Sequence, residues 1–422
     1  MATQLVRTIR GETRRARTRA GLPPRERQRE GRRPHPPAER TDGRKRGIDL
    51  PLLIAIGTLA ALGLMMVYSA TFDWGSTPTE YLVRQVVWLA LGIGVMLVVQ
   101  RVDYAVLHRV SIPLMGLGLA LLIAVLLFGV KLFGSQSTFL AGSIQPSELV
   151  KLISVIYIAD WLASKGEKIR DLSLGLIPFA VVIGVIAGLI VLQPDFGTAG
   201  VIALTAGIMF FLAGADIKQM AIGLIVGGAT FGLVLLNSPH AQDRIQSYLE
   251  AVHDPVQASY HMQQAFIALG SGGLTGAGLG AGRQKFGYLP LPHTDSVFAV
   301  LGEELGLIGA LFVIGLFAYV AYRGFRIALN APDVFGTLIA VGVTSWIVIE
   351  ALINVAVMTG ILPLTGLPLP FISYGGSSLV SLMAAVGLLQ SVARGSRKGL
   401  TRAHVDRGRR NGRPRLSRLS SR

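Results

Sequence analysis

About ten apolar runs, each long enough to cross a lipid bilayer as a helix, follow one another along this 422-residue chain. A membrane-spanning helix needs about 20 apolar residues, and the bilayer interior admits only structures that satisfy their own backbone hydrogen bonds. The runs therefore predict an all-α, polytopic membrane protein. The composition agrees, since 51% of the residues are hydrophobic, 15% are charged and the mean hydropathy is +0.55. The expected spans are 50–70, 81–100, 109–130, 147–163, 174–192, 196–213, 217–237, 296–320, 334–358 and 371–393.

The net charge of +16 lies in the two tails. Residues 1–47 hold 15 Arg and Lys against 5 acids, and residues 394–422 hold 11 against 1, so each tail carries +10 and the body carries −4. Both tails are Arg-rich and poor in large apolar residues, which predicts disordered segments that contact anionic lipid headgroups. Nucleic acid is not an expected partner.

The number and charge of the loops predict the orientation. An even number of spans puts both termini on one side, and the basic tails make that side cytoplasmic under the positive-inside rule. The short loops on that side carry most of the remaining cations: Arg101, Arg109, Lys165, Lys168, Arg170, Lys218, Arg323 and Arg326. The predicted membrane domain is 48–393, and its longest external loop is about 238–295.

Motifs of the common soluble enzymes are missing from the sequence. Without cysteine, neither a disulfide nor a thiolate metal site can form. The sequence contains no HExxH, EF-hand or GxSxG pattern. The glycine-rich run GAGLGAGRQK, Gly276 to Lys285, follows no strand, so it does not predict a nucleotide site.

Three pairs of glycines have the GxxxG spacing that lets membrane helices approach closely. We expect them to serve helix packing. The pairs are Gly184/Gly188, Gly223/Gly227 and Gly302/Gly306.

Charged residues at the edges of the spans are the candidates for function, because an ionisable group at membrane depth is costly unless it is paired or faces a cavity. In QPSELVK, Glu148 and Lys151 are three residues apart and share a helical face. They form a structural ion pair, or Lys151 contacts a substrate anion. In QPDFGT, Asp195 either caps the next helix or serves a site.

Asp295 lies at the start of the eighth span, where two roles would pull its pKa in opposite directions. A helix cap stabilises the carboxylate, whereas a general base near neutral pH needs a raised pKa. Asp295 is therefore displaced from the cap position, or it acts as a carboxylate toward a metal ion or a sugar hydroxyl. Glu303 and Glu304 lie roughly 12 Å deeper along the helix, so we expect structural pairing for at least one of them.

Basic residues share the external loop with Asp295. They are solvated loop charges, or together they bind an anion. Cations beside a carboxylate at the headgroup level suit a lipid-linked phosphate or pyrophosphate. The residues are Arg244, Arg283, Lys285 and His293.

From about residue 49 to 395 the sequence resembles the SEDS family of polytopic cell-wall proteins (FtsW, RodA and SpoVE), and it is closer to the division-type FtsW members. The motifs that carry this resemblance are MMVYSA (65–70), YLVRQVVW (81–88), QPSELVK (145–151), QPDFGT (193–198), YLPLPHTDSVFAVLGEELGLIG (288–309) and NVAVMTGILPLTGLPLPFISYGGSS (354–378).

The resemblance implies a peptidoglycan glycosyltransferase that polymerises lipid II at the outer face of the bacterial cytoplasmic membrane. It also implies a class B penicillin-binding protein as transpeptidase partner, within the division or elongation machinery. The aspartate of the family's HTD motif falls on Asp295, which becomes the candidate catalytic residue. A divalent cation, Mg²⁺ or Mn²⁺, could bind at Asp295, and no organic cofactor is expected. The candidate substrate-binding residues are Arg84, Glu148, Lys151, Arg244, Lys285, His293 and Ser373.

Two departures from the family pattern stand out. Residues 133–140, FGSQSTFL, lack the Arg and Trp that the family usually has there, and Glu350 replaces a common Gln without an obvious partner.

Two alternatives to the enzyme stay open, a lipid II flippase and a non-catalytic scaffold that activates its partner. A transporter is expected to show internal repeats with broken helices near the midplane. We find no such repeat, and the charges gather on the outside, which favours the enzyme.

Overall fold

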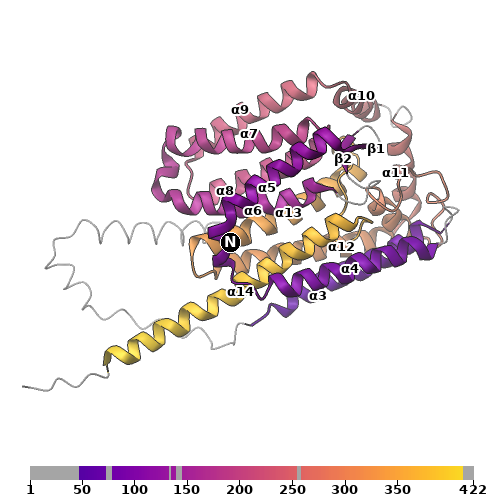
Figure 1. Cartoon of the computed structure of the whole chain (residues 1–422). Helices are drawn as coiled ribbons and strands as arrows, with labels where there is room; N and C mark the ends of the chain where they lie inside the picture. Colours follow the sequence, from indigo (N-terminus) through magenta and orange to yellow (C-terminus); the bar gives the residue numbers. More distant parts are fainter. Residues whose placement is uncertain (1–46, 73–77, 133–134, 139–144, 254–257, 412–422) are drawn as a thin grey trace, which may run out of the picture.

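The protein is a bundle of long helices with one short β-hairpin (Figure 1). The structure is a computed structural model, and it describes residues 47–72, 78–132, 135–138, 145–253 and 258–411. Within these residues, one long helix corresponds to each of the ten predicted spans. These helices are α3 (Leu50–Ala70), α4 (Pro78–Val99), α5 (Leu107–Phe128), α6 (Pro146–Lys165), α7 (Ile177–Val191), α8 (Phe196–Leu212), α9 (Ile217–Leu236), α12 (Val297–Leu329), α13 (Val334–Met358) and α14 (Gly376–Asn411).

Shorter elements connect the spans. Strands β1 (Val130–Leu132) and β2 (Ser135–Thr138) pair in antiparallel fashion. The predicted external loop contains two helices, α10 (Pro239–His253) and α11 (Tyr260–Ser271), and α11 packs on α12 and α13. In Figure 1 these two helices and the hairpin lie at the same end of the bundle. The other short helices are η1 (Tyr104–Val106), η3 (Gly166–Arg170) and η4 (Leu172–Leu176).

Within the described chain, eight of the ten predicted spans form helices that are long and apolar enough to cross a membrane, and the 15-residue α7 reaches this length together with η4, as Leu172–Val191. The other two are α8, which is apolar but has only 17 residues, and α6. Helix α6 carries Glu148, Lys151, Asp160 and Lys165, so its composition alone does not mark it as a span. The first two of these charged residues are instead buried among neighbouring helices, as described below.

Aspartates cap several helices, among them α3, α8 and α13, by accepting backbone N–H groups of the first turn. Asp49 accepts from Leu52 at the start of α3 (3.1 Å). Asp195 accepts from Thr198 at the start of α8 (3.0 Å). Asp333 does the same at the start of α13. Of the two roles left open for Asp195, the structure confirms the cap.

Helix α13 is the centre of the bundle. It contacts α6, α8, α11, α12 and α14, and most of its residues are buried. Apolar side chains on all its faces suit this position, because a helix buried on every side needs no polar face. Helix α9, by contrast, is almost entirely exposed within this chain.

The two ends of the helical domain meet at one end of the bundle, as an even number of spans requires. The Arg323 guanidinium donates two hydrogen bonds to the Asp49 carboxylate (3.1 and 2.6 Å). The Asp49 N–H donates to the side chain of Gln390 in α14 (2.7 Å). Helix α14 then continues to Asn411, into the segment for which the composition predicts disorder. No proline interrupts the chain between the start of this helix and residue 414, and Arg and Leu favour helix.

Helix α12 is broken at Gly306, whose backbone is non-helical (φ 67°, ψ −168°). The loop after α11 enters the break and exchanges backbone hydrogen bonds with α12. Ala277 and Gly278 donate to the carbonyls of Glu303 and Glu304, and the Leu307 N–H donates to Gly273 (2.9, 3.1 and 3.0 Å). The sequence did not predict a broken helix.

The glycine pairs pack differently from the expectation. A Cβ added at Gly302 or Gly306 would clash with α11 or its following loop, so this pair does serve packing. At Gly184, Gly188 and Gly227 a Cβ would meet nothing within 4 Å, and at Gly223 it would meet only a Leu176 methyl. The expected close helix approach at Gly184/Gly188 and Gly223/Gly227 is therefore wrong within the described chain, since these glycines lie on outer faces of α7 and α9.

Candidate active site

Asp295 lies one residue before the N-cap of α12 and does not cap that helix. The N-cap is Ser296. The Asp295 carboxylate instead accepts a hydrogen bond from the Thr294 hydroxyl (3.0 Å), and the residue is partly exposed. Of the alternatives expected for Asp295, the structure therefore shows displacement from the cap position, so the helix N-terminus does not oppose a raised pKa of its carboxyl through a capping hydrogen bond.

The backbone that carries Asp295 is held by three consecutive carbonyl groups, each of which accepts one hydrogen bond. The donors come from α13 and from the loop before α14. They are the Asn354 amide to Asp295 (2.8 Å), the Ser373 hydroxyl to Thr294 (2.5 Å) and the Tyr374 N–H to His293 (2.8 Å). These three hydrogen bonds fix residues 293–295, the HTD segment, against the centre of the bundle.

Ser373 was predicted to bind substrate, but its hydroxyl is engaged with backbone groups. Besides donating to Thr294, it accepts from the Leu369 N–H (2.8 Å), and the side chain is buried. In this arrangement it supports the loop. Asn354 has a similar position, since its amide also donates to Leu367 (2.7 Å). The sequence alone did not indicate this role for Asn354.

The electrostatic environment of Asp295 suits a base. Burial raises the pKa of its carboxyl above the ordinary value, and the nearby charges of His261 and Arg244 oppose this effect. Burial also lowers the pKa of His261. No catalytic motif surrounds His261, so sequence reasoning did not predict this residue beside Asp295.

His293 lies next to the catalytic candidate but is buried and uncharged at neutral pH. Its ring packs against Tyr81 and Tyr374, with centroid distances of 5.3 and 5.7 Å. Burial lowers the pKa of His293 to about 4. The expectation that His293 is one of a group of cations is therefore corrected, because its imidazole carries no positive charge near pH 7.

Two of the predicted cations do border this region. Arg244 in α10 is exposed and donates to the carbonyl of Leu364 (3.3 Å). Arg84 in α4 is also exposed, pairs with Glu80 (2.6 Å) and hydrogen-bonds the Tyr374 side chain. Both guanidinium groups therefore lie at the surface, beside the HTD segment.

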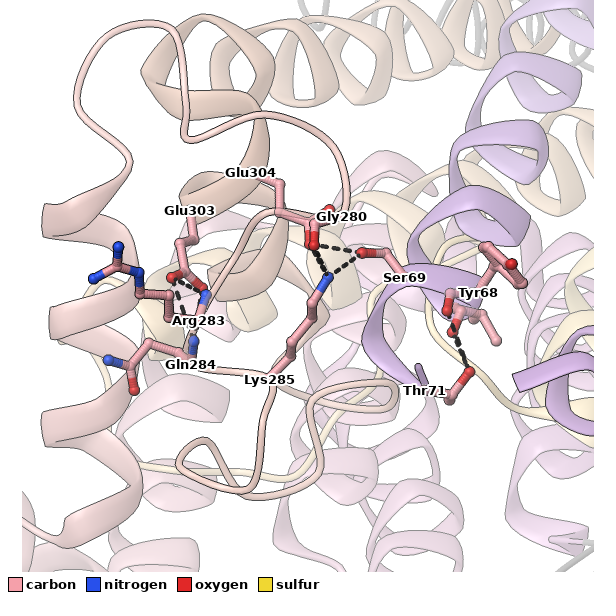
Figure 2. A network of polar contacts seen from close by, with 10 residues as sticks. Tyr68, Ser69, Thr71, Gly280, Arg283, Gln284, Lys285, Glu303 and Glu304 are labelled. Atoms are coloured by element: carbon pink, nitrogen blue, oxygen red, sulfur yellow. Dashed lines mark hydrogen bonds and ion pairs between the residues drawn. The ribbon is translucent and has the colours of Figure 1, made fainter. Parts of the chain in front are cut away.

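Lys285 is committed to a buried network (Figure 2). Its ammonium group lies 2.8 Å from each of three oxygens, which belong to Glu304, Ser69 and the carbonyl of Gly280. The side chains of Lys285 and Glu304 are 2% and 0% exposed. In this structure Lys285 is therefore a structural partner of Glu304, as an unpaired charge at this depth would be costly. Its predicted substrate contact stays a prediction.

Glu303 has a structural role as well. Its carboxylate accepts the backbone N–H groups of Arg283 (2.7 Å) and Gln284 (3.3 Å), as Figure 2 shows. Figure 2 also shows the Arg283 guanidinium pointing away from this carboxylate. Structural pairing, which we expected for at least one of Glu303 and Glu304, holds for both.

Lys151 forms a buried triad with two carboxylates. Its ammonium lies 2.8 Å from Glu148 and 2.8 Å from Glu350, and all three side chains are at most 2% exposed. The Trp346 indole donates to the second oxygen of Glu350 (2.6 Å). Of the two roles left open for the Glu148–Lys151 pair, the structure favours the structural one. It also supplies the partner that Glu350 lacked.

A small cavity about the size of one water molecule borders Lys151. The hydroxyls of Ser154 and Thr205 are buried without a hydrogen-bond partner in the described chain, and both residues line this cavity. An internal water would satisfy them.

The two QP motifs also meet. The Gln145 amide donates to Asp195 (3.4 Å), and the Gln145 N–H donates to the Ser377 hydroxyl (3.2 Å). The divergent loop before QPSE is only partly described. Residues 133–134 and 139–144 lie outside the described residues, so its predicted loss of a substrate contact stays a prediction.

Among the described residues, no three His, Asp or Glu side chains gather in a way that could hold a metal ion. Asp295 offers a single carboxylate, which is fewer protein ligands than a dedicated cation cage uses.

Comparison with known proteins places these features in a family. The family model of the FtsW, RodA and SpoVE cell cycle proteins matches residues 50–398. Stage V sporulation protein E of Bacillus subtilis is 40% identical over 362 residues, covering 84% of this chain and 99% of that protein. The probable peptidoglycan glycosyltransferase FtsW of Trichlorobacter lovleyi is 38% identical over 355 residues, covering 82% and 93%.

Solved structures agree with the fold. One chain from a structure titled as a peptidoglycan synthase complex that coordinates polymerization and crosslinking superposes with a TM-score of 0.70 at 27% identity, covering 83% of this chain and 98% of that one. The crystal structure of Thermus thermophilus rod shape determining protein RodA gives 0.62 at 28% identity, covering 82% and 97%. With its HTD segment, its QP motifs and a family match over most of its length, this chain belongs to the FtsW, RodA and SpoVE family of cell cycle proteins.

Proposed function

We propose that this protein is a peptidoglycan glycosyltransferase that polymerises lipid II at the outer face of the bacterial cytoplasmic membrane, during division or elongation. Family membership and relatives named as probable peptidoglycan glycosyltransferases support the proposal. The observation that carries it is the state of Asp295. Its carboxylate is displaced from the helix cap, its backbone is fixed, and burial raises its pKa.

The proposed chemistry is a single displacement with inversion. The donor is an α-linked sugar pyrophosphate and the polymer is β-linked, so the acceptor hydroxyl attacks the sugar carbon from the opposite face. Asp295 takes the hydroxyl proton, the new C–O bond forms, and the bond to pyrophosphate breaks. A raised pKa suits Asp295 for this task, because a more basic carboxylate accepts the proton more readily.

The departing pyrophosphate needs positive charge. Arg244 and Arg84 are exposed cations that border the HTD segment, and we assign this role to them. A divalent ion, if the reaction uses one, would reach Asp295 bound to the substrate's phosphates, the usual mode for Mg²⁺.

A class B penicillin-binding protein is the proposed partner, as the transpeptidase that crosslinks the glycan. The support is a structural neighbour whose title names a complex of polymerization and crosslinking. The exposed faces of α4 and α9 leave room for a partner helix or for lipid.

The test is Asp295→Asn, which preserves volume and removes the basic carboxylate. Purified protein with its partner and labelled lipid II should lose at least about 100-fold in polymerisation rate, in line with the removal of a general base. Asp171→Asn, an exposed carboxylate between α6 and α7, is the matched control and should polymerise normally.

Undiminished polymer from the Asp295→Asn protein would rule out Asp295 as the base. The broken helix α12 gives the flippase a specific observation in its favour, since transporters use such breaks. Lipid II translocation into liposomes by the same variant separates the two. Translocation without polymerisation by the unmodified protein would establish the flippase.

A further inference from the structure

His261 lies beside the catalytic candidate, although no catalytic motif marks it. It lies in the first turn of α11, 34 residues before Asp295 in the sequence, and its Nε2 atom lies 2.6 Å from the Ser296 hydroxyl. Ser296 follows Asp295 directly and is the N-cap of α12. A hydrogen bond at this point restrains the peptide that carries the base.

The direction of this hydrogen bond follows from the partners of Ser296. The Ser296 hydroxyl has a single proton and donates it to the carbonyl of Pro290 (2.9 Å). Its oxygen can then only accept from His261, so the imidazole carries its proton on Nε2. The relay runs from His261 through Ser296 to Pro290, and it restrains the HTD segment in addition to the hydrogen bond from Asn354.

The packing of α11 determines where this imidazole lies. Met262, Ala265 and Ala268 are buried on one face of α11, and Leu269 contacts α12 at Gly302. A Cβ at Gly272, the residue after α11, would lie 2.0 Å from the Gly302 carbonyl oxygen, so the backbones of α11 and α12 approach closely here. The position of His261 is therefore set by the close contact between α11 and α12.

We infer that His261 is a positioning residue for the base: by donating from Nε2 to Ser296, it holds the Asp295 carboxylate in the orientation that the acceptor hydroxyl requires. The inference rests on the proposed function and adds a residue to its site. It predicts a specific geometric requirement, a donor at the Nε2 position, which an ordinary packing role does not have.

Two amides of different reach test this requirement. Glutamine places its amide nitrogen near the position of Nε2, and asparagine places it near Nδ1. His261→Gln should therefore keep kcat close to that of the unmodified protein. His261→Asn and His261→Ala should lower kcat by roughly 10- to 100-fold with little change in KM, the effect expected of a misaligned catalytic group.

Ser296→Ala provides the second arm. If both residues act through one hydrogen bond, Ser296→Ala should lower kcat to a similar extent, and the double variant His261→Ala/Ser296→Ala should be no worse than either single variant. Thermal unfolding of each purified variant identifies any that fails to fold. If His261→Ala or Ser296→Ala fails to fold, the comparison of His261→Gln with His261→Asn still tests the inference. Both substitutions place a polar amide at the same site, and they differ in where the N–H donor lies.

Asp295→Asn in the same assay separates the two claims. If Asp295→Asn is inactive while His261→Asn and His261→Ala are fully active, the positioning role is wrong and the proposed function stands. If Asp295→Asn polymerises normally, the proposed catalytic base is wrong. Equal losses in His261→Gln and His261→Asn would also overturn the inference, since the Nε2 donor would then have no special value.

Discussion

At the residue scale, Lys151 and Lys285, the two deeply buried lysines of the described chain, both have carboxylate partners. Lys151 pairs with Glu148 and Glu350, and Lys285 pairs with Glu304. The cost of removing a charge from water accounts for this, because a buried ion is tolerated when it is paired and hydrogen-bonded. These lysines are therefore part of the framework, and the role of meeting an anionic substrate is proposed for the exposed Arg84 and Arg244 instead.

The triad around Lys151 leads to a stability prediction. Lys151→Met leaves two carboxylates without their cation and should lower the free energy of unfolding by about 3–5 kcal/mol. Glu350→Gln leaves one carboxylate and one ammonium, keeps an acceptor for the Trp346 indole, and should cost only about 1 kcal/mol. Thermal unfolding of the purified variants in detergent gives the comparison.

Lys168→Met, at an exposed position beyond the end of α6, is the control and should unfold like the unmodified protein. A Lys151→Met protein as stable as this control would contradict the structural role of the triad.

How far these pairings could be predicted depends on sequence distance. Glu148 and Lys151 share a helical face at a spacing of three residues, so their ion pair was foreseeable. Glu350 is 199 residues from Lys151, and nothing in a single sequence indicates which helices become neighbours. The same limit applies to His261 and Ser296. The motif led to Asp295, but most of the groups that hold it come from elsewhere in the chain.

At the element scale, α12 carries the catalytic candidate at its start and a break at Gly306. Apolar periodicity predicted the helix correctly, although it ended the helix at 320 and the structure continues it to Leu329. It could not predict the break, since glycine is common in membrane helices and signals a break only when another segment enters it. Here that segment includes the start of the glycine-rich run Gly276 to Lys285.

Gly306 provides the prediction at this scale. Its conformation lies in a region that only glycine adopts readily, and a Cβ would lie 2.3 Å from the Gly276 nitrogen. Gly306→Ala should displace the loop after α11 and loosen the Lys285–Glu304 network. Because backbone strain and the steric clash add together, it should lower the free energy of unfolding by at least about 3 kcal/mol.

Gly315→Ala is a matched control in the same helix, because a Cβ there meets nothing within 4 Å. It should be neutral or slightly stabilising. The two variants are compared by thermal unfolding and by polymerisation rate. If Gly306→Ala behaved like Gly315→Ala, the loop would not depend on this glycine.

At the scale of the whole molecule, α13 connects the parts of the site. Trp346, Glu350 and Asn354 follow one another at intervals of four residues on this central helix. Glu350 holds the Lys151 triad, and one turn later Asn354 holds the backbone of Asp295. Since α13 contacts five other helices, the HTD segment rests on a highly enclosed element of the fold. Sequence patterns predicted the helices and the placement of both ends of the helical domain at one end of the bundle. They did not predict the central role of α13.

The orientation of the bundle gives the last prediction. The proposed substrate is lipid-linked and lies outside, so the segment that carries Asp295 has to face outward, and the connection between α6 and α7 has to face the cytoplasm. The chain has no cysteine, so single introduced cysteines report their location without background. Tyr288, 56% exposed and seven residues before Asp295, is one site, and exposed Lys168 is the other. In right-side-out membrane vesicles a membrane-impermeant maleimide should label Tyr288→Cys directly, and should label Lys168→Cys only after permeabilisation. The reverse pattern would place Asp295 in the cytoplasm, away from the proposed polymer, and the glycosyltransferase mechanism would have to be abandoned.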